Sequence, residues 1–194
     1  MRMLIETTFV SIDGVISSPE KWVARYWDDE FDKYALDLLL AADALLLGRE
    51  TYQGFARTWP TRTGVYAERI NSVPKFVASK TLSGPLEWNA TLIQGDVGEE
   101  VARLKDQPGE NILKFGTGEL DRTLIEQNLV DEFHLWMHPV AVGGGQRIFD
   151  GLDTTHMTLV ETTRFDSGVV VLAYASTAIR PRGGTKLWRR SAVG

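Results

Sequence analysis

Twice in this chain, a run of apolar residues leads through a short glycine turn directly into a helical pattern. Residues 45–47 are followed by Gly48 and a helix, and residues 111–115 are followed by the turn 116–118 and a second helix. Short apolar runs that alternate with helical patterns are typical of strands in a parallel sheet with helices on both faces. The repeated order therefore predicts an α/β fold.

Strand and helix patterns alternate over the first two thirds of the chain, which predicts parallel βαβ units. The last third differs, because Asp166-Ser167-Gly168 separates two strand patterns in the manner of a hairpin turn. The predicted strands span residues 3–10, 44–47, 75–78, 91–93, 111–115, 132–140, 158–165 and 169–176, and the predicted helices span 28–42, 51–55, 65–71, 97–105 and 119–127.

Composition favours one soluble domain over residues 1–177. The chain has 194 residues, of which 43% are hydrophobic and 24% are charged, as is ordinary for a globular protein. The absence of cysteine excludes disulfides and thiolate metal sites, and there is no apolar run long enough to cross a membrane. We therefore expect a cytoplasmic protein that has no membrane association.

The net charge of −5 is unevenly distributed along the chain. Residues 178–194 contain five basic residues and no acidic one, so the body of the chain is more acidic than the total suggests. An acidic body argues against a nucleic-acid groove, which requires a basic face. Residues 178–194 are predicted to form a basic, solvated tail, and the alternative is that Leu187 and Trp188 pack on a partner subunit.

The turn after residues 45–47 has the composition of an anion site. Gly48 ends the strand, and Arg49 and Thr51 open the helix. A helix N-terminus offers unpaired N–H groups and the positive end of its dipole, while an arginine fork suits phosphate and a threonine adds a hydroxyl. The pattern predicts a phosphate site, with an ordinary glycine turn beside a surface arginine as the alternative.

The second glycine turn indicates the same chemistry. Gly116 and Gly118 flank Thr117 and would let the backbone approach a pyrophosphate closely. Glu119 and Leu120 then open a helix, where an acid is common in any case. The turn is shorter than the G-x-G-x-x-G fingerprint, but two such turns in one chain favour a dinucleotide, which carries more than one anionic group.

A third turn, at the end of residues 75–78, contains Ser79 and Lys80. Their hydroxyl and ammonium groups would suit the additional 2′-phosphate that distinguishes NADPH from NADH. The alternative is an ordinary polar turn.

The candidate catalytic acids are Asp13, Asp28 and Asp29. Asp13 follows the first strand, where the glycine turn could expose backbone groups to a planar ring, or where Asp13 could simply accept from its own turn amides. Asp28 and Asp29 open a helix, and only one carboxylate is needed there as an N-cap. The other could face a cleft, where desolvation would raise its pKa and let it bind an amino-pyrimidine edge or support proton transfer.

The histidines argue against a metal site. His134 and His138 lie on one face of a predicted strand but four residues apart, which is roughly 13 Å at the rise of a strand and too far for one ion. No Gly-x-Ser-x-Gly elbow and no cysteine nucleophile is present. We expect no metal.

Taken together, these segments resemble the dihydrofolate-reductase-like superfamily. Within it, the chain is most similar to the C-terminal reductase domain of the bifunctional riboflavin-biosynthesis deaminase-reductase and to its stand-alone bacterial relatives. The resemblance covers residues 2–176. It rests on the order and spacing of residues 11–14, 48–52, 74–79, 115–120, 129–133 and 139–145.

This resemblance implies an eight-stranded, mostly parallel sheet with flanking helices and an antiparallel C-terminal strand. It also implies NADPH as the cofactor and, because relatives commonly pair, a homodimer, for which the apolar stretch of residues 133–137 is a candidate surface. The implied cofactor contacts are Gly48, Arg49 and Thr51 near the adenosine and pyrophosphate, Gly116, Thr117, Gly118, Glu119 and Leu120 around the pyrophosphate, Ser79 and Lys80 near the 2′-phosphate, and Asp13, Gly14 and Ile16 beside the nicotinamide.

Two departures leave the substrate open. The D-P-x-L-T segment of riboflavin-pathway reductases is replaced by residues 49–53, and the L-P-W loop of dihydrofolate reductases is missing after Ile16. A zinc deaminase domain is excluded by the lack of cysteine. We expect an NADPH-dependent reductase that transfers a hydride to a small pterin- or pyrimidine-type substrate, with a non-catalytic NADP(H)-binding protein of the same fold as the alternative.

Overall fold

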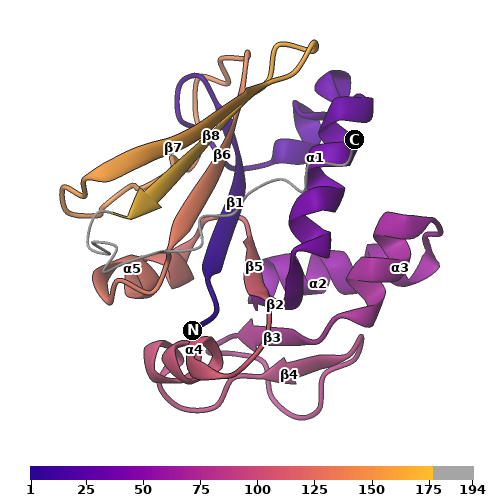
Figure 1. The fold of residues 1–194 in the computed structure, drawn as a ribbon, viewed down its shortest axis with the longest axis vertical. Helices are drawn as coiled ribbons and strands as arrows, with labels where there is room; N and C mark the ends of the chain where they lie inside the picture. Colours follow the sequence, from indigo (N-terminus) through magenta and orange to yellow (C-terminus); the bar gives the residue numbers. More distant parts are fainter. Residues whose placement is uncertain (177–194) are drawn as a thin grey trace.

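Eight strands form one sheet in the order β4-β3-β2-β5-β1-β6-β8-β7 (Figure 1). The computed structural model describes residues 1–176, and the tail predicted for residues 178–194 lies outside the described residues. Neighbouring strands from β4 to β6 in this order pair in parallel, whereas β8 is antiparallel to both β6 and β7. The predicted mostly parallel sheet with an antiparallel C-terminal strand is confirmed. The strands are β1 (Leu4–Ser11), β2 (Ala42–Gly48), β3 (Lys75–Ala78), β4 (Ala90–Leu92), β5 (Asn111–Phe115), β6 (Glu132–His138), β7 (Met157–Arg164) and β8 (Val170–Ser176).

Helices cover both faces of this sheet (Figure 1). One core cluster includes side chains of α1, α2 and α3, and a second includes side chains of α4 and α5. We find no helix among residues 1–176 with the length and apolar character that a membrane crossing requires. The helices are α1 (Asp29–Leu40), α2 (Arg49–Thr58), α3 (Val65–Ser72), α4 (Val97–Asp106) and α5 (Glu119–Glu126), with short 3₁₀ turns η1 (Pro19–Lys21), η2 (Ala24–Tyr26) and η3 (Trp59–Thr61).

Strand β2 shows why the apolar runs are continuous. Leu45 and Leu47 belong to the cluster with α1–α3, whereas Ala44 and Leu46 belong to the cluster with α4 and α5. Successive side chains of a strand point to opposite faces, so a sheet covered on both sides requires apolar residues at every position. The two clusters are thus two cores separated by one sheet.

The boundary between α1 and β2 differs from the prediction. The helix was predicted to reach residue 42, but it ends at Leu40, and Ala42 already belongs to β2. Ala42 fits the helical periodicity equally well, but its backbone pairs with Asn111 of β5, with a register shift before Ala44. A long-range pairing therefore decides a boundary that local periodicity cannot.

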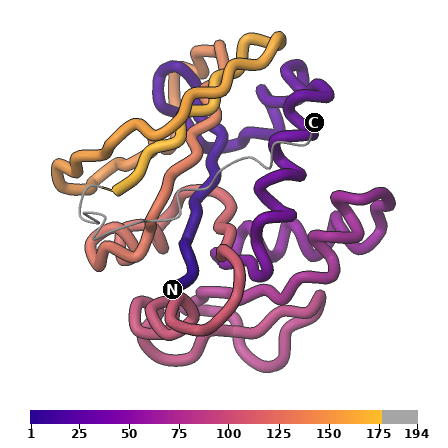
Figure 2. The backbone as a smooth tube through the Cα atoms, viewed as in Figure 1, coloured from indigo at the N-terminus to yellow at the C-terminus, as the bar shows by residue number. Residues whose placement is uncertain are grey.

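Strand β1 runs through the middle of the molecule from the N-terminus, which lies beside α4 (Figure 2). There Arg2 N donates to Lys105 O at 2.7 Å. The strand pairs with β5 on one side and β6 on the other. Because these strands are parallel, the segments that follow β1 and β5 emerge at the same edge of the sheet.

The apolar residues that suggested a dimer surface are mostly buried within the monomer. Phe133, Leu135 and Trp136 belong to or contact the two cores, and none is more than 8% exposed. Strand β6 lies between β1 and β8, so it has no free edge. The homodimer stays a prediction, and this strand does not supply its interface.

Candidate functional site

The two glycine turns lie side by side at the carboxyl edge of the sheet. Strands β2 and β5 are parallel neighbours, so the turns that follow them meet. A Cβ atom built on Gly116 would lie 3.8 Å from Thr51 Oγ1, at the start of α2. Two segments that are distant in the sequence therefore form one continuous rim, as expected if both serve one ligand.

The turn between β2 and α2 is open. Gly48 is the N-cap of α2, and no side chain caps this helix end. A Cβ atom on Gly48 would meet no atom within 4 Å. Arg49 is partly exposed and pairs with Glu50 at 3.2 Å. An uncapped helix end next to a guanidinium is an arrangement that binds anions.

The turn between β5 and α5 is more tightly constructed. Gly116 has a φ of +72°, a left-handed conformation that favours glycine. Gly118 is extended, and a Cβ atom there would enter open space. The Gly118 N–H donates to Asp121 Oδ2, and Asp121 lies in the first turn of α5.

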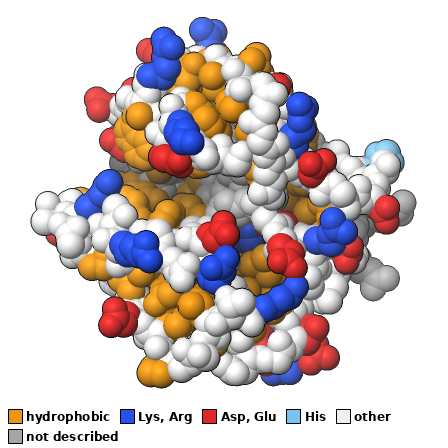
Figure 3. Space-filling model, turned by 180° about the vertical axis from the view of Figure 1, so that it is seen from behind, with side chains coloured by type: hydrophobic (Ala, Val, Ile, Leu, Met, Phe, Trp, Pro, Cys, Tyr) orange, Lys and Arg blue, Asp and Glu red, His pale blue; other side chains and the backbone are white. Residues whose placement is uncertain are grey.

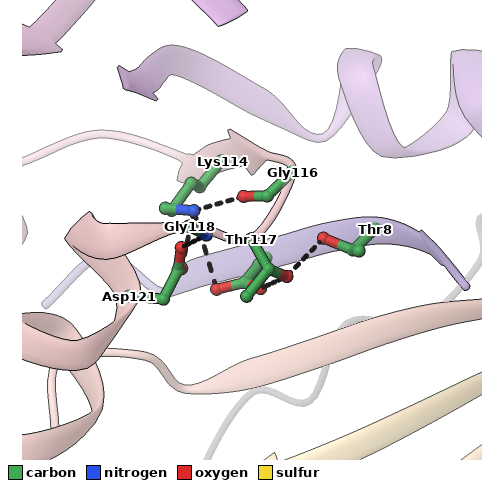
Figure 4. A network of polar contacts seen from close by, with 7 residues as sticks. Thr8, Lys114, Gly116, Thr117, Gly118 and Asp121 are labelled. Atoms are coloured by element: carbon green, nitrogen blue, oxygen red, sulfur yellow. Dashed lines mark hydrogen bonds and ion pairs between the residues drawn. The ribbon is translucent and has the colours of Figure 1, made fainter. Parts of the chain in front are cut away.

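A buried group of three charged side chains, Glu6 of β1, Lys114 of β5 and Asp121 of α5, lies directly beneath this second turn. We call these residues the buried triad, and none of their side chains is more than 2% exposed. Lys114 Nζ lies 2.6 Å from Asp121 Oδ1 and 3.8 Å from Glu6 Oε2. Figure 4 shows Lys114, Thr117 and Asp121 converging on the turn, with Thr8 beyond Thr117.

Ser79 and Lys80 follow β3 and reach the same rim. Ser79 Oγ accepts hydrogen bonds from the backbone N–H groups of Thr81 and Leu82, as in an ordinary polar turn. Lys80 Nζ lies 2.5 Å from Glu119 Oε1, and both side chains are exposed. The hydrogen bond and charge of Lys80 lower the pKa of Glu119. This ion pair connects the segment after β3 with the start of α5.

A cavity of about 750 Å³ opens beside the rim, at the end of β1. Of the predicted cofactor residues, Ile16, Thr51, Gly116 and Thr117 line it. In the space-filling view the molecule is hollowed across the middle of one face, with hydrophobic side chains beside the hollow and side chains of both charges below it (Figure 3). The cavity is rich in aromatic rings, including Trp27, Phe31, Phe55, Trp59, Phe115 and Trp136.

The structure corrects the expected position of the acid. Asp28 is the N-cap of α1, where it accepts from Phe31 N at 2.8 Å, and this hydrogen bond lowers its pKa instead of raising it. Asp29 is exposed, and neither residue lines the cavity. Asp32 does line it, one helical turn later. The acid that reaches the cavity is therefore Asp32, about one helical turn beyond the cap, and not the residue next to the cap.

Asp32 lies at the rim of the cavity among aromatic groups. Trp27 Nε1 donates to Asp32 Oδ1 at 2.6 Å. Across the cavity, burial and then the negative charge of Asp32 raise the pKa of the Tyr66 hydroxyl. A carboxylate beside an apolar, aromatic wall can bind the amino edge of a planar ring.

Asp13 holds two distant loops together, a role that neither interpretation of the sequence included. Its carboxylate accepts from Ser11 Oγ at 2.6 Å and from the N–H groups of Val142 and Gly143, and these hydrogen bonds lower its pKa. Neither Asp13 nor Gly14, which has a φ of +84°, lines the cavity. Asp13 thus joins the loop after β1 to the loop after β6. The loop after β1 carries Ile16 to the cavity.

His134 and His138 are both buried on β6. His134 Nδ1 lies 2.8 Å from the Tyr34 hydroxyl, and its Nε2 lies 3.3 Å from Glu132 Oε2. Burial lowers the pKa of His138. Within residues 1–176 there is no group of three or more histidine, cysteine or acidic side chains suited to a metal ion.

Sequence reasoning missed Asp32 and the buried triad. A signal for the triad was present, because Glu6 and Lys114 each interrupt an apolar strand pattern with a charge. Charged residues are almost never fully buried unless they are paired. Two charged residues within predicted core strands therefore indicate that they share a partner, although the sequence does not show that Asp121 completes the set.

Comparison with known proteins places this geometry in a family. The RibD C-terminal domain model matches residues 2–171. The chain is similar to the uncharacterized protein YyaP of Bacillus subtilis (strain 168), with 32% identity over 179 residues, 89% of this chain and 94% of YyaP.

Two solved structures have the same fold. A putative riboflavin biosynthesis protein from Shewanella sp. PV-4 superposes with a TM-score of 0.70 at 22% identity, over 90% of this chain and 98% of that one. A dihydrofolate reductase from Enterococcus faecalis, solved in complex with NADP(H), superposes with a TM-score of 0.60 at 18% identity, over 90% of this chain and 96% of that one. The chain therefore belongs to the RibD C-terminal domain family and has the dihydrofolate-reductase-like fold.

Proposed function

We propose that this protein is an NADPH-dependent reductase that transfers a hydride to a small pterin- or pyrimidine-type ring. The observation that carries the proposal is the convergence of three sequence-predicted turns on one rim beside an aromatic cavity. A dinucleotide requires separate sites for its phosphates and for its reactive ring, and the rim and the cavity together offer both. The cavity volume of about 750 Å³ suits a ligand of this size.

The residues of the rim fit such a cofactor. Gly48 and Gly118 would each direct a Cβ atom into open space, so glycine leaves room that any other residue would fill. The uncapped start of α2 and Arg49 would hold phosphate, and Thr117 and Gly118 would cradle the pyrophosphate. Ser79 and Lys80 are the proposed contacts of the 2′-phosphate.

When bound, NADPH supplies a hydride, and the protein orients the ring and provides for the proton. Ile16, at the end of the loop that Asp13 holds, would border the nicotinamide. The aromatic rings that line the cavity favour a planar substrate. Asp32 would bind the amino edge of that substrate and support proton transfer to the reacting nitrogen.

The assignment of Asp32 is tested by comparing Asp32→Asn with Asp29→Asn. We expect the first variant to lower turnover by about a hundredfold or more, within the range for acid–base groups, with NADPH affinity unchanged. Asp29 lies three residues away and does not line the cavity, so its variant serves as the matched control. Equal turnover in both variants would remove Asp32 from the mechanism.

The proposal itself is tested by a substrate screen that follows the loss of NADPH absorbance. Dihydrofolate and a ribosylamino-pyrimidine are the first two substrates to include. Binding of NADPH without turnover of either class would favour the alternative, a non-catalytic NADP(H)-binding protein of the same fold. Failure to bind NADPH at all would refute both functions.

A further inference from the structure

Each residue of the turn 116–118 is held by a different member of the buried triad. Figure 4 shows Lys114 and Asp121 beside the turn. Lys114 Nζ donates to the carbonyl oxygen of Gly116. Thr117 Oγ1 donates to Glu6 Oε1 at 2.6 Å, and the Gly118 N–H donates to Asp121 Oδ2. The conformation of the turn therefore depends on three charged groups that lie in the interior and not on the surface.

The charges of the triad do not balance if all three groups are ionised. Two carboxylates would then face one ammonium in an environment where an uncompensated charge is costly. The ammonium of Lys114 lies 2.6 Å from Asp121 but 3.8 Å from Glu6. Glu6 is thus the carboxyl group with the weaker compensation, and a proton on Glu6 would make the triad neutral.

The hydrogen bonds of Glu6 also call for a proton. Among the described residues, no donor reaches the buried atom Glu6 Oε2, and Asp121 acts on the ionisation of Glu6 both by its charge and as a hydrogen-bond partner. Two ionised carboxylates can only accept, whereas a protonated Glu6 can donate to Asp121. Burial, together with the nearby charge of Asp121, raises the pKa of Glu6 well above its ordinary value, against the opposing effect of Lys114.

No other charge in the described structure compensates Glu6. In the sheet its neighbours are Lys114 on β5 and Phe133 on β6. The groups that act on its ionisation are Lys114, Asp121 and the Thr117 hydroxyl. Thr117 Oγ1 also lies 2.8 Å from Thr8 Oγ1, and both threonines line the cavity, so the triad is one hydrogen bond away from the ligand space.

We propose that Glu6 is protonated in the resting protein, that the buried triad is the positioning element of the turn 116–118, and that cofactor affinity falls when Glu6 loses this proton. The cofactor part rests on the proposed function. An ionised Glu6 would repel Asp121, which accepts the hydrogen bond of the Gly118 N–H. It would also place uncompensated negative charge beneath the pyrophosphate. Binding of the anionic cofactor is then linked to retention of one proton.

The test measures the dissociation constant of NADPH between about pH 6 and about pH 9. Loss of a single linked proton changes this dissociation constant by at most about tenfold per pH unit. The variants are the wild type, Glu6→Gln and the exposed control Glu99→Gln. Glutamine at position 6 can still accept from Thr117 and donate to Asp121, but it cannot ionise. We expect affinity to fall with pH in the wild type and in Glu99→Gln and to stay level in Glu6→Gln, with near-equal affinities at the acidic end. Parallel pH profiles in all three proteins would overturn the proposal.

A second measurement needs no cofactor. At neutral pH, infrared spectroscopy should detect the carbonyl band of one protonated carboxyl group in the wild type, and this band should be missing in Glu6→Gln. If the band is present but NADPH does not bind, the proposed function and the coupling fail while the proton assignment stands. If the band is absent from the wild type, the proton assignment fails even where NADPH binds.

Discussion

The two glycine turns share one sequence pattern, but only the second is hydrogen-bonded to buried side chains. The turn after β2 leads into a helix that no side chain caps, and its Arg49 is partly exposed. The turn after β5 is attached at every residue to the buried triad. Strand, glycine and helix therefore specify where an anion can approach, while the interior beneath decides how firmly the turn is held.

This difference has a consequence for substitutions. The open turn depends on backbone geometry and on groups that remain solvated, so changes there should alter binding with little effect on folding. The anchored turn depends on buried groups, and the loss of either Lys114 or Asp121 would leave the other charge unpaired in the interior, which is costly. Five predictions test this contrast, from the largest expected effect to the smallest.

Lys114→Met should destabilise the protein by about 3–5 kcal/mol, the range for removing one partner of a buried ion pair. The two remaining carboxyl groups would have no cation, and Gly116 would lose its side-chain donor. Urea unfolding measures the change. Lys80→Met is the matched control, because its ion pair with Glu119 is exposed and such pairs contribute little. A similar loss of unfolding free energy in both variants would show that burial of the triad does not contribute to stability.

Gly118→Val should weaken NADPH binding by about a hundredfold or more, roughly 2.7 kcal/mol, and leave the fold intact. Gly118 is extended, a conformation that valine adopts, and its side chain would enter the space assigned to the pyrophosphate. Calorimetry provides the affinity. Gly54→Val, on the exposed side of α2 and also with open space around it, is the control.

Gly116→Val should also lose affinity, but it is the weaker test. Its φ of +72° disfavours a β-branched residue, so binding and folding would change together. Unchanged affinity in a folded Gly118→Val protein would refute the proposed cradle.

Glu6→Gln should make stability less dependent on pH. The raised pKa of Glu6 means that, above the ordinary pKa of glutamate, the native protein retains a proton that the unfolded chain has lost. Stability then falls as pH rises toward the raised pKa, by at most about a tenfold change in the unfolding equilibrium constant per pH unit. Urea unfolding at several pH values should show this slope in the wild type and a flatter one in the variant. A steeper slope in Glu6→Gln would contradict the protonated state.

NADPH should bind about tenfold more tightly than NADH, a difference of roughly 1.4 kcal/mol. The basic groups that motivate this preference, Arg49 and Lys80, are both exposed. Lys80→Gln should reduce the ratio without changing the unfolding transition, because Lys80 is exposed and is a proposed contact of the 2′-phosphate. Equal affinities of the wild type for the two cofactors, measured by calorimetry, would remove the 2′-phosphate assignment.

Much of the fold was predictable because its signals are local. The apolar runs at Leu45–Leu47 and residues 111–115, the breaker at Gly48 and the hairpin turn at Gly168 each lie within a few residues of the element that they define. The boundary at Ala42 was wrong, because its strand conformation depends on pairing with Asn111. A residue that suits either element is assigned by a partner that is distant in the sequence.

The candidate site was predictable to a smaller extent. The glycine turns were found because glycine at a strand end has few other uses, and the structure brings them together. Asp32 was not found, because several acids open α1 and the sequence does not indicate which of them faces the cavity. The rotation of α1 against the sheet decides that question. Contacts of Phe31 with Phe9 of β1 and Trp136 of β6 help to set this rotation.

By itself, the sequence determined the order of strands and helices along the chain, the turns at which phosphates are proposed to bind, and the absence of thiolate chemistry. Only the tertiary structure decided that Glu6, Lys114 and Asp121 meet beneath one of those turns, and that Asp32 and not Asp28 reaches the cavity. The physical reason is the range of the interactions. Periodicity and turn geometry act over a few residues, whereas a buried charge is compensated by whichever partner the packed sheet and helices place beside it.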